Sequence, residues 1–280
     1  MVTTGESSAD IMQIESGAHL ESDAAGRPTL PSILVLTPVK NATNYLDGYI
    51  AGLEALNYPR ARLSLGILEG DSTDNTKVAL ENIRPRLDRR FSRVKLLSRN
   101  YNFHMPAGVP RWTPAYQKTR RQILARSRNY LLSRTLQEEG WVLWLDVDVI
   151  SYPNNLIERL LAAERDIVHP HCVTVPGGPT FDRNAWRDQG RMHMQDLRGS
   201  EGPVRLDTVG GTVLLIKADL HREGLIFPPF PYGVESRLIR KPHPVWQAGE
   251  IETEGLGIMA RDMGAQCWGL PDLEVIHAPG

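Results

Sequence analysis

Two aspartates, Asp146 and Asp148, stand one residue apart directly after the apolar run 141–145. The run predicts a buried strand, so the two carboxylates are expected where that strand opens onto solvent. In open α/β sheets ligands bind outside the carboxyl ends of the strands. Carboxylate oxygens at that edge suit a divalent cation that carries the phosphates of a substrate. The pair therefore indicates a site for a nucleotide sugar.

The same aspartates have a simpler explanation. Paired aspartates often form a solvated turn or cap the next helix, and the residues after Pro153 do predict a short helix. A calcium-binding helix–loop–helix is excluded because its sixth and twelfth positions, counted from Asp146, would be Ser151 and Ile157 rather than Gly and Glu. Their position alone leaves metal binding and helix capping open.

Polar residues also follow the first two predicted strands. Thr37 and Pro38 end the first strand, and Glu69 and Asp71 come after the second, so all four are expected at the same sheet edge as Asp146. Asp71 can accept hydrogen bonds from a base or a ribose. A turn followed by a helix cap would explain some of these residues equally well. The convergence of three strand ends favours nucleotide contacts for Asp71.

A long helix predicted over 119–136 carries several arginines. They cannot all share one face at helical spacing, so some are expected on the solvated surface. Arg121 and Arg128 are seven residues apart and do share a face. We expect one of these two to reach a phosphate.

Glu250, Glu252 and Glu254 alternate just before an apolar helical stretch. The helix dipole favours acidic residues at such a position, so an exposed helix start is one interpretation. In the other, one or two of these carboxylates lie beside a sugar, as ligands of its hydroxyls or as the base that accepts a proton from an acceptor.

His277 ends a short predicted strand near the C-terminus. A lone histidine is more often structural than a metal ligand. Beside two aspartates, however, it would complete a site of nitrogen and oxygen donors that suits manganese. His169, His171 and Cys172 are not expected to bind a metal, because no partner motif accompanies them.

The 280 residues, of which 41% are hydrophobic, are enough for a substantial core. Predicted strands alternate with helices, which indicates an α/β fold with a mostly parallel sheet. Residues 1–28 are polar and acidic, and we expect a disordered tail there. We expect residues 29–280 to form a single domain. A formal net charge of −1 argues against nucleic-acid binding.

Four polar segments occur in one order along the chain, namely 37–41, 69–76, 146–149 and 252–255. Together with the arginine-rich helix, they resemble the fungal mannosyltransferases of the Golgi mannan polymerase, over about residues 33 to 277. The resemblance implies a GT-A type nucleotide-sugar-binding fold, with helices flanking the central sheet. It also implies GDP-mannose as donor, manganese (Mn2+) as metal cofactor, and transfer to a hydroxyl acceptor with retention at the anomeric carbon.

By motif position, the resemblance assigns the metal site to Asp146, Asp148 and His277. The metal would neutralise the departing diphosphate. A retaining front-face reaction needs no strong base, so Glu252 and Glu254 would position sugar hydroxyls or stabilise positive charge at the anomeric carbon. With the two aspartates, these are the expected catalytic residues. The residues expected near the nucleotide are Thr37, Pro38, Glu69, Asp71 and Arg121.

Three alternatives stay open. An enzyme of this fold could use a different nucleotide sugar, or it could invert the anomeric configuration with Glu252 or Glu254 as base. The chain could also be a non-catalytic subunit of a glycosyltransferase complex. Retention of Asp146 and Asp148 argues against that role, because a degenerate subunit has no need of a charged pair at the sheet edge.

Location and partners follow from the same comparison. Members of the family are anchored by an N-terminal membrane span, and no run of this sequence approaches the ~18 apolar residues of a span. We expect a cytoplasmic relative or an anchorless fragment of a Golgi lumen protein. The expected partners are a nucleotide sugar, a carbohydrate acceptor and, in homo- or hetero-oligomers, other glycosyltransferases.

Overall fold

Strands and helices alternate along the first half of the chain, as predicted. The computed structural model describes residues 21–22, 28–106, 108–110, 113–239, 243 and 245–279. The strands are β1 (Glu21–Ser22), β2 (Pro28–Thr29), β3 (Ile33–Val39), β4 (Leu63–Glu69), β5 (Arg93–Ser98), β6 (Trp141–Leu145), β7 (Val149–Ser151), β8 (Ile167–Val173), β9 (Trp186–Arg187), β10 (Met192–His193), β11 (Val204–Leu206), β12 (Val213–Lys217) and β13 (Cys267–His277). The helices are α2 (Thr43–Ala55), α3 (Thr76–Asp88), α4 (Pro114–Thr135), α5 (Leu156–Leu161), α6 (Ala218–Arg222) and α7 (Glu252–Asp262), with 3-10 turns η1 (Arg60–Arg62) and η2 (Met194–Leu197).

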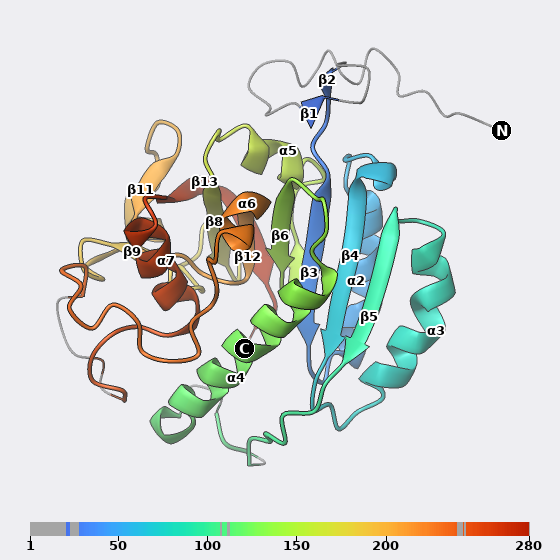
Figure 1. Ribbon diagram of the computed structural model, residues 1–280, viewed down its shortest axis with the longest axis horizontal. Helices are drawn as coiled ribbons and strands as arrows, with labels where there is room; N and C mark the ends of the chain where they lie inside the picture. Colours follow the sequence, from blue (N-terminus) through green and yellow to red (C-terminus); the bar gives the residue numbers. More distant parts are fainter. Residues whose placement is uncertain are drawn as a thin grey trace.

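One large sheet organises these elements (Figure 1). Within the described residues, nine strands form it in the order β11-β13-β8-β12-β6-β3-β4-β5, with β7 paired to β13. Strands β6, β3, β4 and β5 are parallel neighbours, and β8 is parallel to β13. Strand β12 is antiparallel to both β6 and β8. The predicted α/β fold with a mostly parallel sheet flanked by helices is confirmed.

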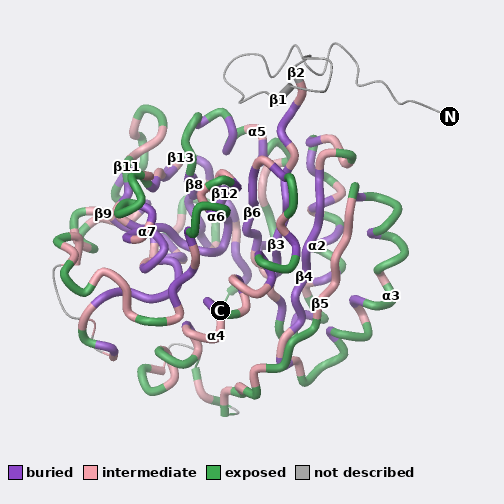
Figure 2. Tube along the Cα trace, in the orientation of Figure 1, coloured by how far each residue is buried: buried purple, intermediate pink, exposed green. Residues whose placement is uncertain are grey.

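Both faces of the sheet are buried, because side chains alternate along each strand. In β3, Ile33 and Val35 belong to one apolar cluster, whereas Leu34 and Leu36 belong to the other. Helices α2, α3 and α5 complete the first cluster, and α4, α6 and α7 complete the second. Figure 2 shows the central strands buried and exposed surface along the outer side of α3.

The ends of several strands meet at one edge of this sheet. Strands β3, β4 and β6 are parallel, so their carboxyl ends share that edge. Strand β12 runs the opposite way, and its first residue, Val213, pairs with Leu145 at the end of β6. His277 at the end of β13 pairs with Val149. Helix α4 contacts β3, β4 and α7. This edge therefore gathers segments that are far apart in the sequence.

Most of the predicted tail lies outside the described residues, namely residues 1–20 and 23–27. Next to these segments, Glu21–Ser22 pairs with Pro28–Thr29 in a short antiparallel ladder. The division into a tail and one domain stays a prediction. In the part of the chain that the structure describes, no helix combines the length and apolarity needed to cross a membrane.

Candidate active site

Asp146 is held from two sides at the carboxyl end of β6. Its backbone N–H donates to the carbonyl of Thr212 at 2.8 Å, and its Oδ1 accepts from Nη2 of Arg128 at 3.2 Å. Arg128 is 2% exposed; its Nη1 donates to Glu252, and its Nη2 also donates to the Gly211 carbonyl. Burial raises the pKa of Asp146 to about 7, against the charge of Arg128. One buried guanidinium thus fixes the first aspartate of the pair.

Asp148 lies beside His277. The imidazole Nε2 is 3.1 Å from Oδ1 of Asp148, and Nδ1 is 2.6 Å from the carbonyl oxygen of Ala278. The ring also stacks on Phe181, with centroids 4.0 Å apart. Burial alone would lower the pKa of His277, but the hydrogen bond and charge of Asp148 raise it above its usual value. The strand-end histidine and the second aspartate are therefore brought together.

The predicted metal site is only partly assembled. The described residues contain no group of three or more His, Cys, Asp or Glu side chains that could hold a metal ion. Asp146 is turned to Arg128, whereas Asp148 and His277 face each other. The pair offers one oxygen and one nitrogen donor, and a backbone carbonyl next to Nδ1 is typical of metal-binding histidines. The three-ligand site stays a prediction.

Two of the alternating glutamates, Glu252 and Glu254, form ion pairs with arginines of α4. Glu252 begins α7 with a φ of 62° and is 3% exposed. Arg121 donates from Nη1 to Glu254 at 2.7 Å and from Nη2 to the carbonyl of Ile251 at 2.8 Å, and Nη2 is 3.5 Å from Glu252. Nε1 of Trp186 donates to Glu254 at 2.7 Å. The alternative of an exposed acidic helix start is therefore wrong.

Arg121 and Arg128 share the buried face of α4, as their spacing predicted. Both guanidinium groups are engaged with carboxylates and carbonyls. A phosphate contact by either arginine stays a prediction.

Thr37 and Glu69 hold the strand ends together. The Thr37 hydroxyl is buried and donates to the carbonyl of Leu145 at 2.7 Å. Glu69 accepts from the backbone N–H of Ser72 at 3.0 Å and from the hydroxyl of Ser98 at 2.7 Å. Both side chains therefore have structural partners, and their predicted position near a nucleotide stays a prediction.

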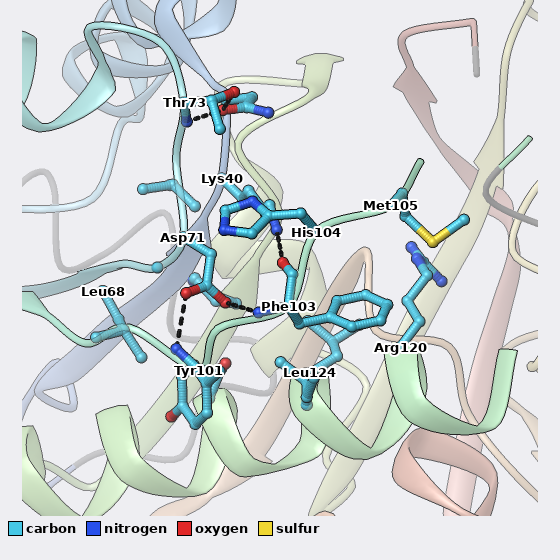
Figure 3. A pocket seen from close by; sticks show the side chains of 16 residues that line it. Lys40, Leu68, Asp71, Thr73, Tyr101, Phe103, His104, Met105, Arg120 and Leu124 are labelled. Carbon is cyan, nitrogen blue, oxygen red and sulfur yellow. Dashed lines mark hydrogen bonds between the residues drawn. The ribbon is translucent and has the colours of Figure 1, made fainter. Parts of the chain in front are cut away.

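Asp71 anchors the loop that follows β5 (Figure 3). It adopts a φ of 57°, and its Oδ1 accepts from the backbone N–H of Tyr101 at 2.7 Å and of Asn102 at 3.1 Å. Its Oδ2 accepts from Phe103 at 3.4 Å. The ammonium of Lys40 donates to the carbonyl of Phe103. Asp71 shapes this loop through the same oxygens that would serve a base or ribose.

Two pockets adjoin at this edge. The first, of about 490 Å³, is drawn in Figure 3 and includes Asp71, Tyr101 and Phe103. The second has a volume of about 630 Å³. Of the residues predicted from sequence, the second pocket is lined by Pro38, Arg121, Arg128, Asp146, Asp148, Glu252 and His277. Pro38, Lys40, Arg120 and Leu124 line both pockets. Lys40 and Arg120, which the sequence analysis did not single out, therefore lie on the shared wall.

Asp182 was also missed. Its Oδ2 accepts from the backbone N–H groups of Gly211 at 2.8 Å and Thr212 at 3.1 Å, and Asp182 lines the second pocket together with the aspartate pair. A Cβ on Gly210 would lie 2.1 Å from the same oxygen, so a larger residue at this position would displace the Asp182 carboxylate. The Gly210–Gly211 pair is the sequence signal for this close approach.

Comparison with known proteins gives relatives over most of the chain. The mnn9 subunit of the mannan polymerase complex of Schizosaccharomyces pombe is 30% identical, over 88% of this chain and 79% of that protein. The anp1 subunit of mannan polymerase II complex from the same organism is 28% identical, over 88% of this chain. This chain spans 63% of the length of that anp1 subunit. A mouse protein named inactive glycosyltransferase 25 family member 3 is 25% identical over 77% of this chain.

A solved structure shares the fold. The mannosyltransferase PcManGT from Pyrobaculum calidifontis, in complex with GDP-Man and Mn2+, matches 96% of this chain and 62% of that one, with a TM-score of 0.53 and 15% identity. The architecture is thus the GT-A fold of glycosyltransferases. The family model described as Anp1 matches residues 15–198 and 188–231. The order of the polar segments along the chain had indicated a resemblance to this family. The chain therefore belongs to the Anp1 family.

Proposed function

We propose that the chain transfers mannose from GDP-mannose to a hydroxyl acceptor, with a divalent metal and with retention at the anomeric carbon. The junction of the two pockets carries this proposal. One pocket has aromatic walls, the other has carboxylate walls, and Lys40 and Arg120 lie where they meet. A nucleoside diphosphate sugar has the same three parts, a planar base, an anionic linker and a polyhydroxylated ring.

The base and the diphosphate would occupy the first pocket and the shared wall. Tyr101 and Phe103 supply ring surface, and aromatic stacking is worth about 1–3 kcal/mol per base. Arg120 and Lys40 supply positive charge for the phosphate oxygens. Stacking is tolerant of base identity, so guanine recognition rests on the family and not on this geometry.

The mannose would lie in the second pocket, beside Glu252. The guanidinium of Arg128 donates to this carboxylate from Nη1 and to Asp146 from Nη2. A fixed carboxylate next to the anomeric carbon stabilises the positive charge that develops as the diphosphate departs. The acceptor hydroxyl can pass its proton to the departing phosphate oxygen on the same face, so the reaction needs no separate base.

Asp148 and His277 would hold the metal, with Asp146 on the same pocket wall. The Ala278 carbonyl next to Nδ1 leaves Nε2 of His277 to face the pocket and Asp148. A cation such as Mn2+ would supply Lewis-acid stabilisation of the leaving diphosphate.

Calorimetric titration tests the proposal. GDP-mannose, GDP and UDP-glucose are titrated into the protein, each with manganese and with a chelator. We expect metal-dependent binding of the two guanine ligands. The Asp148→Asn variant should lose the metal dependence and the transfer activity, while Asp47→Asn on the exposed face of α2 should keep both. Binding of UDP-glucose alone would keep the fold but overturn the donor.

A second candidate function is a non-catalytic subunit of a complex. It is favoured by relatives named as mannan polymerase subunits and by one named an inactive glycosyltransferase. In either case we propose association with other glycosyltransferase subunits. If Asp148→Asn leaves the activity of a reconstituted complex unchanged, the scaffold function is favoured over the enzyme. The cellular location stays a prediction.

A further inference from the structure

A third pocket, of about 320 Å³, lies on the other side of the Arg121–Glu254 pair from the second pocket. Arg121 lines the second pocket, and its partner Glu254 lines the third. The third pocket also includes Trp186, Glu250 and Arg191. Its volume is at the lower end of the range of small-molecule sites, which is about 300–1,000 Å³. One ion pair, 2.7 Å long, therefore separates it from the predicted sugar site.

Glu250 is only partly satisfied in this pocket, because the Trp246 side chain hydrogen-bonds its carboxyl group while the other oxygen has no partner among the described residues. It is 7% exposed, and its Oε2 has no hydrogen-bond donor among the described residues. Its backbone is fixed by reciprocal hydrogen bonds with Tyr232, at 2.8 and 2.9 Å. A Cβ on the preceding Gly249, which has a φ of 76°, would lie 2.8 Å from the Tyr232 carbonyl oxygen. The carboxyl group is thus held in place by a rigid backbone while one buried oxygen remains unsatisfied, an arrangement that a ligand hydroxyl would relieve.

The other charges of the pocket are already balanced. Glu254 accepts from Arg121 and from Trp186, and Arg191 donates to Asp188 at 2.6 Å. Burial, together with the charge of Glu254, raises the pKa of Glu250 to about 8, so this group is mostly protonated at neutral pH. A carboxylic acid both donates and accepts a hydrogen bond, as a sugar hydroxyl does. The pocket therefore suits a neutral polar ligand better than an ion.

We propose that the third pocket binds a sugar ring of the acceptor, one removed from the ring that receives the mannose. The mostly buried indole of Trp186 forms part of the pocket wall, and Glu250 supplies the hydrogen bond to a hydroxyl of the sugar. The ring that reacts must reach the second pocket, and the Arg121–Glu254 pair separates the two places. This inference rests on the proposed function. A sugar site in the third pocket makes the chain selective for acceptors of more than one sugar.

The test is direct binding of an α-mannotetraose, compared with methyl α-mannoside, by saturation-transfer NMR and calorimetry on the full chain. Glu250→Leu removes both hydrogen-bonding atoms, and we expect the tetraose to bind about tenfold more weakly. Glu250→Gln stays uncharged and keeps a donor and an acceptor, so its affinity should remain close to that of the wild type. Glu201→Leu, on an exposed turn, is the matched control.

Leu238→Trp gives an independent test, because it fills the pocket from a partly exposed position and does not depend on Glu250. It should also weaken tetraose binding while leaving methyl α-mannoside and GDP-mannose unaffected. If both Leu238→Trp and Glu250→Leu fold and bind the tetraose as the wild type does, the inference is overturned. If the wild type does not bind GDP-mannose, the donor assignment is overturned instead. The oligosaccharide titration does not measure donor binding, so the two failures can be told apart.

Discussion

Arg128 lies 3.2 Å from Asp146, and its guanidinium is almost completely buried. The same group donates to Glu252 from its other terminal nitrogen. Two carboxylates that would otherwise repel each other in the pocket thus share one positive charge. The arrangement joins the end of β6 to the start of α7, so it links the strand that carries the aspartate pair to the helix that carries the glutamates.

We expect Arg128→Leu to lower the free energy of unfolding by about 3 to 5 kcal/mol, because it leaves buried carboxylates without a partner. Urea denaturation measures this change. Arg126→Leu, at an exposed position of the same helix, is the matched control and should change stability by less than about 0.5 kcal/mol. Equal stability of the two variants would mean that the carboxylates do not depend on Arg128.

The pH dependence of stability should reveal Glu250. Its pKa in the folded protein, about 8, lies above the unfolded value, so the folded state holds the proton more tightly. The resulting stabilisation is fully present below the unfolded pKa and is lost as pH rises towards 8, by at most about 1.4 kcal/mol per pH unit. Glu250→Gln cannot ionise and should therefore gain stability relative to the wild type between pH 5 and 8. Urea unfolding at pH 5, 6.5 and 8 measures the difference, and Glu201→Gln should show none.

The strands were predictable because their burial has a simple period. The alternation in β3 puts Ile33 and Leu34 on opposite faces, and a continuous apolar run is what burial on both faces requires. The antiparallel direction of β12 was not predictable, since a short apolar strand carries no signal of its direction. Its direction matters, because it brings Thr212 to the end of β6, where the Thr212 carbonyl accepts from the backbone N–H of Asp146.

The site could be predicted from sequence where its residues lie at the ends of strands. It could not be predicted where tertiary contacts determine the position or burial of a side chain. Asp148 follows β6 and His277 is the last residue of β13, and their side chains meet. The burial of Glu252 contradicts the usual exposure of acidic helix starts, because two arginines seven residues apart on α4 compensate its charge. Asp182 lies in irregular backbone, so no periodicity could have placed it in the pocket that the aspartate pair lines.

His277 gives a test of the metal site that does not require transfer activity. If Asp148 and His277 hold Mn2+, removing the imidazole deletes one ligand, and we expect His277→Ala to weaken Mn2+ binding at least as much as the roughly 10- to 100-fold loss typical of outer-shell changes. Competition with a fluorescent chelator measures the affinity. His193→Ala on β10 is the control, since this histidine lies outside both pockets' described linings. Unchanged Mn2+ affinity in His277→Ala would place the metal elsewhere.

Asp71 should control the nucleotide pocket through the loop and not through the metal. Its carboxylate accepts from three consecutive backbone N–H groups, Tyr101 to Phe103, and hydrogen bonds to a charged group contribute about 1.5–3 kcal/mol each. Asn tolerates the left-handed φ of this position, so Asp71→Asn removes charge without adding backbone strain. We expect faster amide exchange at 101–103 and weaker GDP binding in this variant, with Mn2+ affinity in the absence of nucleotide unchanged.

Asp47→Asn should alter none of these quantities. If Asp71→Asn weakens GDP binding but leaves amide exchange at 101–103 as in the wild type, Asp71 contacts the nucleotide directly and the loop is held by its other contacts, such as the hydrogen bond from Lys40 to Phe103.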